Sequence, residues 1–374
     1  MGFLTAMIVM YQKRLIIIAL MLTAIFSACT KGLHLKVAPE DFIAPEYPVL
    51  TGKPVLAWTE KLSSTPKAVE YLAGTYVLII TYPGEVFTMD LTSRKKKVRR
   101  WYPFRNRISA HIIDRNTGRL YLVSRREDKL IAYNMLNKKQ VWKRKIQHIG
   151  SHAALIGRTL MLSQTTGTII ALDNDSGRLL ESRKTKKQVA GMMHHSSDTL
   201  LIITADGVVQ AYTEKLEPVW QLTVNLNPNP VYTVDKDRIV LADSDGRIKV
   251  IDVRRGVLQF ELDVHTPIYA PLLLSGERLF IATSAGEVLG IDLADGKVRW
   301  RYQGAGLINQ PLLGNKSTLL VTYARGKLVL LNQDSGAEQW SYEFDHPLKR
   351  ISLAPQGVIT VDSERQISYL QVLP

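Results

Sequence analysis

Short apolar runs, some of them with alternating apolar and polar positions, recur along this chain from about residue 54 to its end. The pattern is clearest in the run GEVLGIDLADGKVRW, which begins at Gly286, and in GKLVLLNQDSGAEQW, which begins at Gly326. Side chains of a strand point alternately to its two faces, so the alternating apolar residues predict β-strands. An Asp-Gly or Ser-Gly pair divides each run, and glycine reaches φ > 0 there without steric cost, so each run predicts a β-hairpin.

The hairpins repeat with a period of roughly forty residues, which the tryptophans mark. Each tryptophan ends a hairpin, and the six are Trp58, Trp101, Trp142, Trp220, Trp300 and Trp340. The gaps are 43, 41, 78, 80 and 40 residues, so the two long gaps are two periods each, with Glu181 and Phe260 at the missing positions. Two more short apolar runs precede each hairpin, and four strands per unit are typical of a propeller blade.

The chain holds seven full units and an incomplete one. Residues 357–373 offer two strands after a short run near residues 351–353, and no fourth strand follows. The segment PVLAWTEKL at residues 54–62 has the pattern of that missing outer strand. An open ring would leave unpaired strand edges. We therefore predict an all-β, eight-bladed propeller over residues 54–374, with the last of its four-stranded blades closed by the N-terminal strand.

We interpret the tryptophans as structural. A large ring at a strand end fills the widening gap between two blades, and its indole N–H can reach a backbone carbonyl. The alternative is a platform on which a ligand stacks, but six equivalent positions suit a ring of blades better than one site.

The N-terminus predicts a signal peptide over residues 1–28. Lys13 and Arg14 precede an apolar run at residues 15–25, which is too short to span a bilayer comfortably, and Phe26-Ser27-Ala28-Cys29 follows. This order is similar to the lipobox of bacterial lipoproteins, in which the cysteine is lipidated. The alternative is an ordinary secretory signal with an incidental cysteine.

Cys29 is the single cysteine of the chain, which favours thioether lipidation there. Thr30 follows it in place of the aspartate that retains lipoproteins in the inner membrane, which favours the outer membrane. Residues 29–53 contain several prolines and few strand signals, so we predict a lipidated tether that joins the membrane to the ring on its periplasmic side. Beyond the N-terminus there is no long apolar run, which excludes a multi-span membrane protein.

The formal net charge is +14, and the excess is concentrated in a few places. The densest run contains Arg94, Lys95, Lys96, Lys97, Arg99 and Arg100. Further basic residues follow at 138–145 and 183–187, in the next two units. We predict one basic sector of the ring that attracts anionic partners, such as phospholipid headgroups, lipopolysaccharide phosphates or an acidic protein face. Nucleic acid is not expected outside the cytoplasm. A solvated surface without a partner is the alternative.

No pattern of catalytic or metal-binding residues stands out. His194 and His195 are adjacent, and neighbouring residues of a strand point to opposite faces, so a shared metal is not expected. The Asp-rich stretches at 173–175 and 243–245 lack the glutamate that a calcium loop needs at its twelfth position, and turn chemistry explains them better. We expect no catalytic residue, no metal site and no cofactor.

The stretches ALDNDSG at 171–177 and GIDLADGKVRW at 290–300 resemble the repeat of quinoprotein-like propellers. One branch of that superfamily, the quinoprotein dehydrogenases, is longer and stacks its cofactor against a vicinal disulfide, which a chain with one cysteine cannot form. The other branch is the BamB family of outer-membrane assembly lipoproteins, which this chain resembles in lipobox, tether, blade number and length. That resemblance implies a non-catalytic scaffold that binds the periplasmic domains of the barrel-inserting subunit.

In that family the partner contacts come from loops that join consecutive blades. By position these are residues 184–190 and 225–230, with candidate contacts at Lys184, Lys186, Lys187, Gln188, Val189, Asn225, Asn227 and Asn229. The family pattern has an apolar-arginine stretch in the first loop and acidic residues in the second, and neither is present here. Plain connecting loops are therefore an alternative. The alternative function is an envelope propeller that binds another protein, a glycan or a small ligand.

Overall fold

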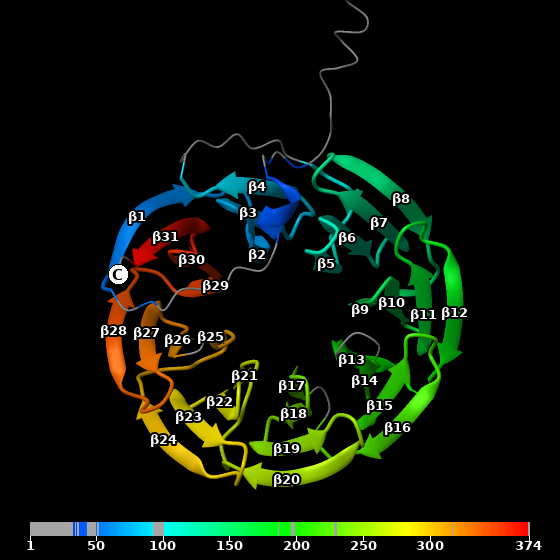
Figure 1. Ribbon diagram of the computed structural model, residues 1–374. Helices are drawn as coiled ribbons and strands as arrows, with labels where there is room; N and C mark the ends of the chain where they lie inside the picture. The colour runs from blue at the N-terminus through cyan, green and yellow to red at the C-terminus, as the bar shows by residue number, and fades with distance from the viewer. Residues whose placement is uncertain are drawn as a thin grey trace, which may run out of the picture.

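Eight small antiparallel sheets form a closed ring in the computed structural model (Figure 1). The structure describes residues 33, 35, 37–42, 50, 52–92, 101–185, 187–195, 199–227, 230–315 and 317–372. Each sheet is one blade, and its strands run in sequence order from the inside of the ring to the outside, except at the closure. The predicted eight-bladed propeller is confirmed.

The strands of each blade are given from the inside outward. Blade 1 has β2 (Pro66–Ala73), β3 (Tyr76–Thr81) and β4 (Val86–Asp90), and blade 2 has β5 (Ala110–Asp114), β6 (Arg119–Ser124), β7 (Lys129–Asn134) and β8 (Lys139–Lys145). Blade 3 has β9 (Ile149–Ile156), β10 (Thr159–Gln164), β11 (Thr168–Asp173) and β12 (Leu179–Lys184), and blade 4 has β13 (Val189–His195), β14 (Thr199–Thr204), β15 (Val208–Thr213) and β16 (Pro218–Thr223). Blade 5 has β17 (Val231–Val234), β18 (Arg238–Ala242), β19 (Arg247–Asp252) and β20 (Val257–Asp263), and blade 6 has β21 (Leu273–Ser275), β22 (Arg278–Ala282), β23 (Glu287–Asp292) and β24 (Val298–Gln303). Blade 7 has β25 (Leu313–Gly314), β26 (Thr318–Thr322), β27 (Lys327–Asn332) and β28 (Glu338–Glu343).

Blade 8 combines the two ends of the propeller. Its three inner strands are β29 (Leu348–Ala354), β30 (Gly357–Asp362) and β31 (Gln366–Val372), and its outer strand is β1 (Pro54–Lys61). The register of β1 on β31 is antiparallel, from Pro54 opposite Val372 to Lys61 opposite Gln366. Figure 1 shows β1 lying along β31 at the rim. The predicted closure by the N-terminal strand is thus confirmed.

Burial differs between the middle and the outer strands of a blade. β26 and β30 are buried at every position, whereas β12 is exposed at every position. A middle strand is covered on both faces because its sheet is packed between two neighbouring blades, so its sequence reads as a continuous apolar run rather than an alternating one. Alternation of apolar and polar positions is instead a property of outer strands such as β24, whose exposure alternates.

The tryptophans join neighbouring blades, which confirms their structural interpretation. Four indole Nε1–H groups each donate to a backbone carbonyl of the next blade, and the pairs are Trp58 to Leu91 (2.9 Å), Trp142 to Asn174 (2.9 Å), Trp220 to Val253 (2.8 Å) and Trp300 to Gln333 (2.9 Å). A fifth, that of Trp340, donates to the carbonyl of Leu50, which precedes β1 (3.3 Å). We call this contact the indole latch. Phe260 occupies the same place in blade 5 and lies against Gly296 of the next blade.

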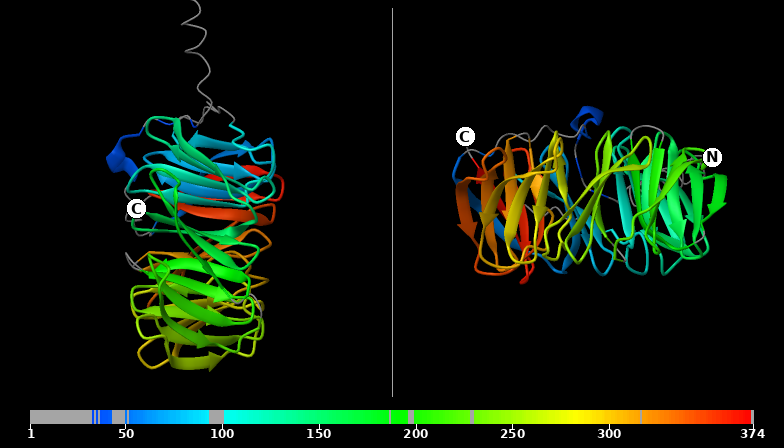
Figure 2. Two further views of the ribbon diagram at one scale, coloured as in Figure 1. Left: turned by 90° about the vertical axis from the view of Figure 1, so that its right-hand side faces the viewer. Right: turned by 90° about the horizontal axis from the view of Figure 1, so that it is seen from below.

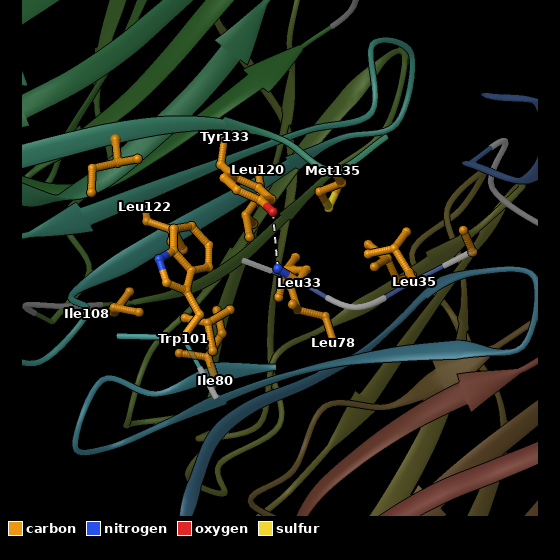
Figure 3. Close-up of a cluster of buried hydrophobic side chains, with 14 of the residues drawn as sticks. Leu33, Leu35, Leu78, Ile80, Trp101, Ile108, Leu120, Leu122, Tyr133 and Met135 are labelled. Atoms are coloured by element: carbon orange, nitrogen blue, oxygen red, sulfur yellow. Dashed lines mark hydrogen bonds between the residues drawn. The ribbon is translucent and has the colours of Figure 1, made fainter. Parts of the chain in front are cut away.

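The described N-terminal residues 33, 35, 37–42 and 50 pack on blades on both sides of the ring closure, and we call them the N-terminal strap. Leu33, Leu35 and Phe42 are buried in one cluster with blades 1 and 2, and the Leu33 N–H donates to Tyr133 Oη at 3.1 Å (Figure 3). Leu50 is buried in the cluster of blades 7 and 8. The described residues of this stretch are therefore packed on the ring, where the sequence predicted an extended tether. Cys29 and the signal peptide lie outside the described residues.

Candidate functional site

The two faces of the ring carry different connections. One face carries the links between blades and the turns between second and third strands, and we call it the connection face. The other carries the remaining hairpin turns, and we call it the hairpin face. The strap lies on the hairpin face, since Val37 lies against Gly74 in the β2–β3 turn and Phe42 against Gly118 in the β5–β6 turn. Figure 2 shows the ring edge-on, with the short helix η1 (Pro39–Phe42) on one face.

The first predicted contact loop, residues 184–190, is fixed to its own blade on the connection face. Thr185 is buried, and its hydroxyl donates to the Gly167 carbonyl at 2.7 Å. The Gln188 side-chain amide donates to the Thr165 carbonyl at 3.1 Å. Val189 is buried and packs in the cluster between blades 3 and 4, so Lys184, Lys187 and Gln188 provide the exposed side chains. Lys186 lies outside the described residues.

The second loop, residues 225–230, is held by the β18–β19 turn of blade 5. The Asn227 N–H donates to Asp243 Oδ2 at 3.0 Å, and Arg247 donates to Asn227 Oδ1 at 3.0 Å. Asn225 has a φ of +47°, which asparagine tolerates better than most residues. Asn229 lies outside the described residues.

Asp243 is the buried acid of the β18–β19 turn that holds this second loop. Burial alone would raise its pKa, but the N–H groups of Asn227 and Asp245 and the guanidinium of Arg247 outweigh burial and hold the pKa of Asp243 below its usual value. Arg247 lies 2.7 Å from the carboxylate, so the charge is paired within the turn. The acid therefore serves the conformation of the loop.

The two loops lie on either side of one turn. The β14–β15 turn of blade 4 contacts both of them. The Ala205 N–H donates to the Gln188 carbonyl at 2.9 Å, and the Val224 N–H, directly before the second loop, donates to the Gly207 carbonyl at 2.9 Å. A Cβ on Gly207 would also lie 3.8 Å from the Leu226 carbonyl oxygen. The structure thus brings together two segments that the sequence separates by about one repeat. We call residues 184–190 and 225–230 the paired loops.

The predicted basic sector is described only in part. Lys139, Lys143 and Lys145 are exposed on β8, and Lys184 is exposed on β12, so these residues lie on the outer strands of neighbouring blades (Figure 1). The residues of the densest run, Arg94, Lys95, Lys96, Lys97, Arg99 and Arg100, lie outside the described residues. Whether all three basic runs act as one surface therefore stays a prediction.

The joint between blades 3 and 4 has no indole latch. Glu181 stands at the tryptophan position of β12 and is exposed. Arg183 replaces the indole as donor to the next blade, since its Nη1 donates to the Leu216 carbonyl at 3.0 Å. Its guanidinium also lies 5.5 Å from the centre of the Tyr212 ring. Leu216, with a φ of +59°, is buried in the apolar cluster between blades 3 and 4. The shorter repeat of blade 4 was the available signal, but nothing in the sequence indicated that Arg183 replaces the indole.

A groove of about 730 Å³ opens beside this altered joint. It is lined by Thr159, Leu180, Glu181, Ser182, Arg183, Glu214, Lys215, Leu216 and Glu217. Both signs of charge line it, so it has no clear preference for a charged ligand.

Among the described residues, no three His, Cys, Asp or Glu side chains are grouped so that they could hold a metal ion. No helix in this part of the chain could cross a bilayer.

Comparisons with known proteins agree with this architecture. The chain matches BamB from Moraxella catarrhalis at 16% identity with a TM-score of 0.68, over 85% of this chain and 100% of that one. It matches the computationally designed Ika8 protein at 14% identity and a TM-score of 0.72, over 84% and 98% of the chains. It matches Saccharomyces cerevisiae Sqt1 at 13% identity and a TM-score of 0.70, over 87% and 100%. At such identities these likenesses establish the fold alone.

The comparison by sequence identifies the family, which these structural likenesses do not. A comparison with curated protein sequences gives no match. A family profile described as "Outer membrane protein assembly factor BamB" matches residues 126–270 and 265–369, which is most of the ring. The chain belongs to this BamB family of β-propellers.

Proposed function

We propose that this protein is a non-catalytic scaffold lipoprotein, anchored in the outer membrane and facing the periplasm, that serves the machinery for assembly of outer-membrane β-barrels. In this proposal the paired loops bind the periplasmic domains of the central barrel-inserting subunit. The observation that supports the proposal is that both loops lie against one turn, the β14–β15 turn of blade 4, through the Gln188 carbonyl and the Leu226 carbonyl. A surface that is ordered before binding loses less conformational entropy when a partner docks.

The position of the strap supports the orientation that such a scaffold needs. Cys29 lies four residues before Leu33, and four extended residues span at most about 14 Å. Leu33 is buried between blades 1 and 2, so a lipid on Cys29 would hold that edge of the ring close to the bilayer. The strap crosses the hairpin face, whereas the paired loops lie on the connection face, so anchoring leaves the loops accessible.

The partner is tested by purifying the full-length lipidated protein from its native membrane and identifying what remains bound. We expect the barrel-inserting subunit to be recovered with the native protein and to be lost when Lys184 and Lys187 are both changed to Glu. The matched control changes Lys143 and Lys145 to Glu, since these lysines are exposed on the outer strand of the neighbouring blade. Recovery of a different envelope protein through the same lysines would support the alternative function.

The membrane anchor is tested separately with a labelled fatty acid. We expect the native protein to incorporate the label and Cys29→Ser to remain unlabelled. A native protein without label would refute lipidation, and the partner proposal would then have to stand without a membrane anchor.

A further inference from the structure

A pocket of about 540 Å³ opens on the connection face at blades 1 and 2. Its lining residues are Lys67, Tyr82, Arg107, Ile108, Ser109, Arg125, Arg126 and Ser151. They come from the start of β2, the β3–β4 turn, the link from blade 1 to blade 2, the β6–β7 turn and β9. Arg350 of β29 approaches from blade 8, where its guanidinium donates to Tyr82 Oη at 3.0 Å and to the Lys67 carbonyl at 2.6 Å. The volume is within the usual range for ligand pockets.

Every charged residue at this pocket is a cation. The five are Lys67, Arg107, Arg125, Arg126 and Arg350, and we call their site the basic pocket. None of these five forms an ion pair within the described part of the chain. Cations gathered without a carboxylate repel one another, so the site gains stability when it binds an anion.

The nearest carboxylates along these segments are already paired. Glu127 follows Arg126, but it accepts from Lys129 at 2.7 Å and from the Asn106 N–H at 2.8 Å. Glu70 of β2 lies 2.6 Å from His111 on the neighbouring inner strand. Glu85 is buried in the β3–β4 turn and does not line the pocket. Asp128, in the β6–β7 turn, accepts from the Ile149 N–H at 3.2 Å and does not line the pocket either. Arginine charge at the mouth is therefore not neutralised from within the described residues.

The donors are divided between a fixed interior and a free rim. Lys67 directs its ammonium to the carbonyls of Ile108 and Ser109 at 2.7 and 2.6 Å, and burial followed by repulsion from Arg350 lowers its pKa. Lys67 and Arg350 thus supply positive potential rather than unused donors. Arg107, Arg125 and Arg126 are exposed, and their guanidinium groups make no hydrogen bond to any described residue.

From this arrangement we infer that the basic pocket binds an acidic segment of a partner polypeptide. A compact phosphate needs donors that converge on one point, whereas the free arginines here stand on two separate segments. Each guanidinium fork can take one carboxylate in bidentate fashion, so carboxylates spaced along one chain match the site better. Arginine clusters commonly recognise acidic motifs in this way. The site shares a face with the paired loops and does not depend on them or on the identity of their partner.

The inference is tested with a fluorescently labelled peptide of six aspartates separated by glycines, by anisotropy at low ionic strength. We expect the full-length protein to bind it and to ignore the peptide in which asparagine replaces aspartate. Arg125→Glu with Arg126→Glu should weaken binding by about tenfold or more, since one lost charge-assisted contact already accounts for about that factor. Arg107→Gln should weaken it to a smaller extent, and it serves as a second variant if the double change disturbs folding.

The matched control is Arg254→Glu with Arg255→Glu. These adjacent arginines are exposed in the β19–β20 turn of blade 5, on the hairpin face, and the substitution changes net charge by the same amount. It should leave the affinity nearly unchanged. Equal losses in both double variants would reduce the effect to overall charge and overturn the site, as would equal binding of the asparagine peptide. Capture of inorganic phosphate or of phosphatidylglycerol vesicles through Arg125 and Arg126, without peptide binding, would also overturn it.

Discussion

At the scale of single residues, the turn glycines of the hairpins have two roles, of which the sequence indicated one. They adopt φ > 0, as expected for hairpin turns. They also lie directly against the indole of the preceding blade, since a Cβ on Gly256 would stand 2.3 Å from the Trp220 ring and one on Gly177 would stand 2.8 Å from Trp142. This second role could not be deduced from the pattern, because it joins residues of different blades.

The two roles can be separated by comparing two glycines. Gly256→Ala should lower the free energy of unfolding through both backbone strain and displacement of Trp220, whereas Gly276→Ala meets nothing within 4 Å and suffers the strain alone. We expect about 1 kcal/mol for Gly276→Ala and clearly more for Gly256→Ala. Urea unfolding monitored by tryptophan fluorescence measures both. Equal losses would mean that the indole moves aside without cost.

The buried acid Asp243, which holds the second of the paired loops, gives stability a defined dependence on pH. The folded-state pKa of Asp243 is depressed, so its contribution is complete above the unfolded-state pKa of about 3.9 and is lost as pH falls through the lower folded-state value. We expect Asp243→Asn to reduce stability by roughly 1–3 kcal/mol at neutral pH and to flatten the decline below pH 4.

Asp245→Asn is the control for this measurement, because Asp245 is exposed in the same turn. Thermal unfolding between pH 3 and 7 should separate the two variants. An unchanged acid limb in Asp243→Asn would refute the assignment.

At the scale of elements, the repeating pattern was enough to locate the blades but not to describe every joint. The period of apolar runs and the six tryptophans predicted the eight blades and the closing pair of β1 and β31, because each signal recurs. The joint between blades 3 and 4 departs from the repeat, so repetition could not predict it. The paired loops were placed through family resemblance, and their common turn became visible only in three dimensions.

Arg183 should be the residue that holds the altered joint. Arg183→Ala removes the bond to the Leu216 carbonyl and the contact with Tyr212, so we expect a loss of about 1–2 kcal/mol and faster amide exchange in the β15–β16 turn. Hydrogen exchange of the intact protein measures the local effect. Arg178→Ala, at an exposed position before β12, is the control and should leave exchange in that turn unchanged.

At the scale of the whole molecule, the strap adds a second closure to the one that β1 provides. It connects blades 1 and 2 through Leu33, Leu35 and Phe42, and it reaches the blade 7 to blade 8 joint through Leu50. Sequence reasoning missed it because a few apolar residues between prolines have no period. Its partner Tyr133 is also 100 residues away along the chain from Leu33.

Phe42 offers a direct test of the strap. The side chain is fully buried, so Phe42→Ala should cost about 3 kcal/mol or more if the strap is part of the cooperative unit. Unfolding of the full-length protein should then stay a single transition at a lower midpoint. If the strap is only loosely attached, the midpoint will not move and only protease sensitivity near the N-terminus will rise.

The pairing of β1 with β31 also sets the order of events during biogenesis. A chain that emerges from its N-terminus delivers the closing strand first and the edge that receives it last. Until β31 is in place, β1 has no strand to pair with, and the ring stays open with apolar side chains exposed at its end. Closure of the ring therefore requires a contact between strands about 310 residues apart along the chain, and contacts of such large sequence separation form slowly and leave strand edges exposed meanwhile.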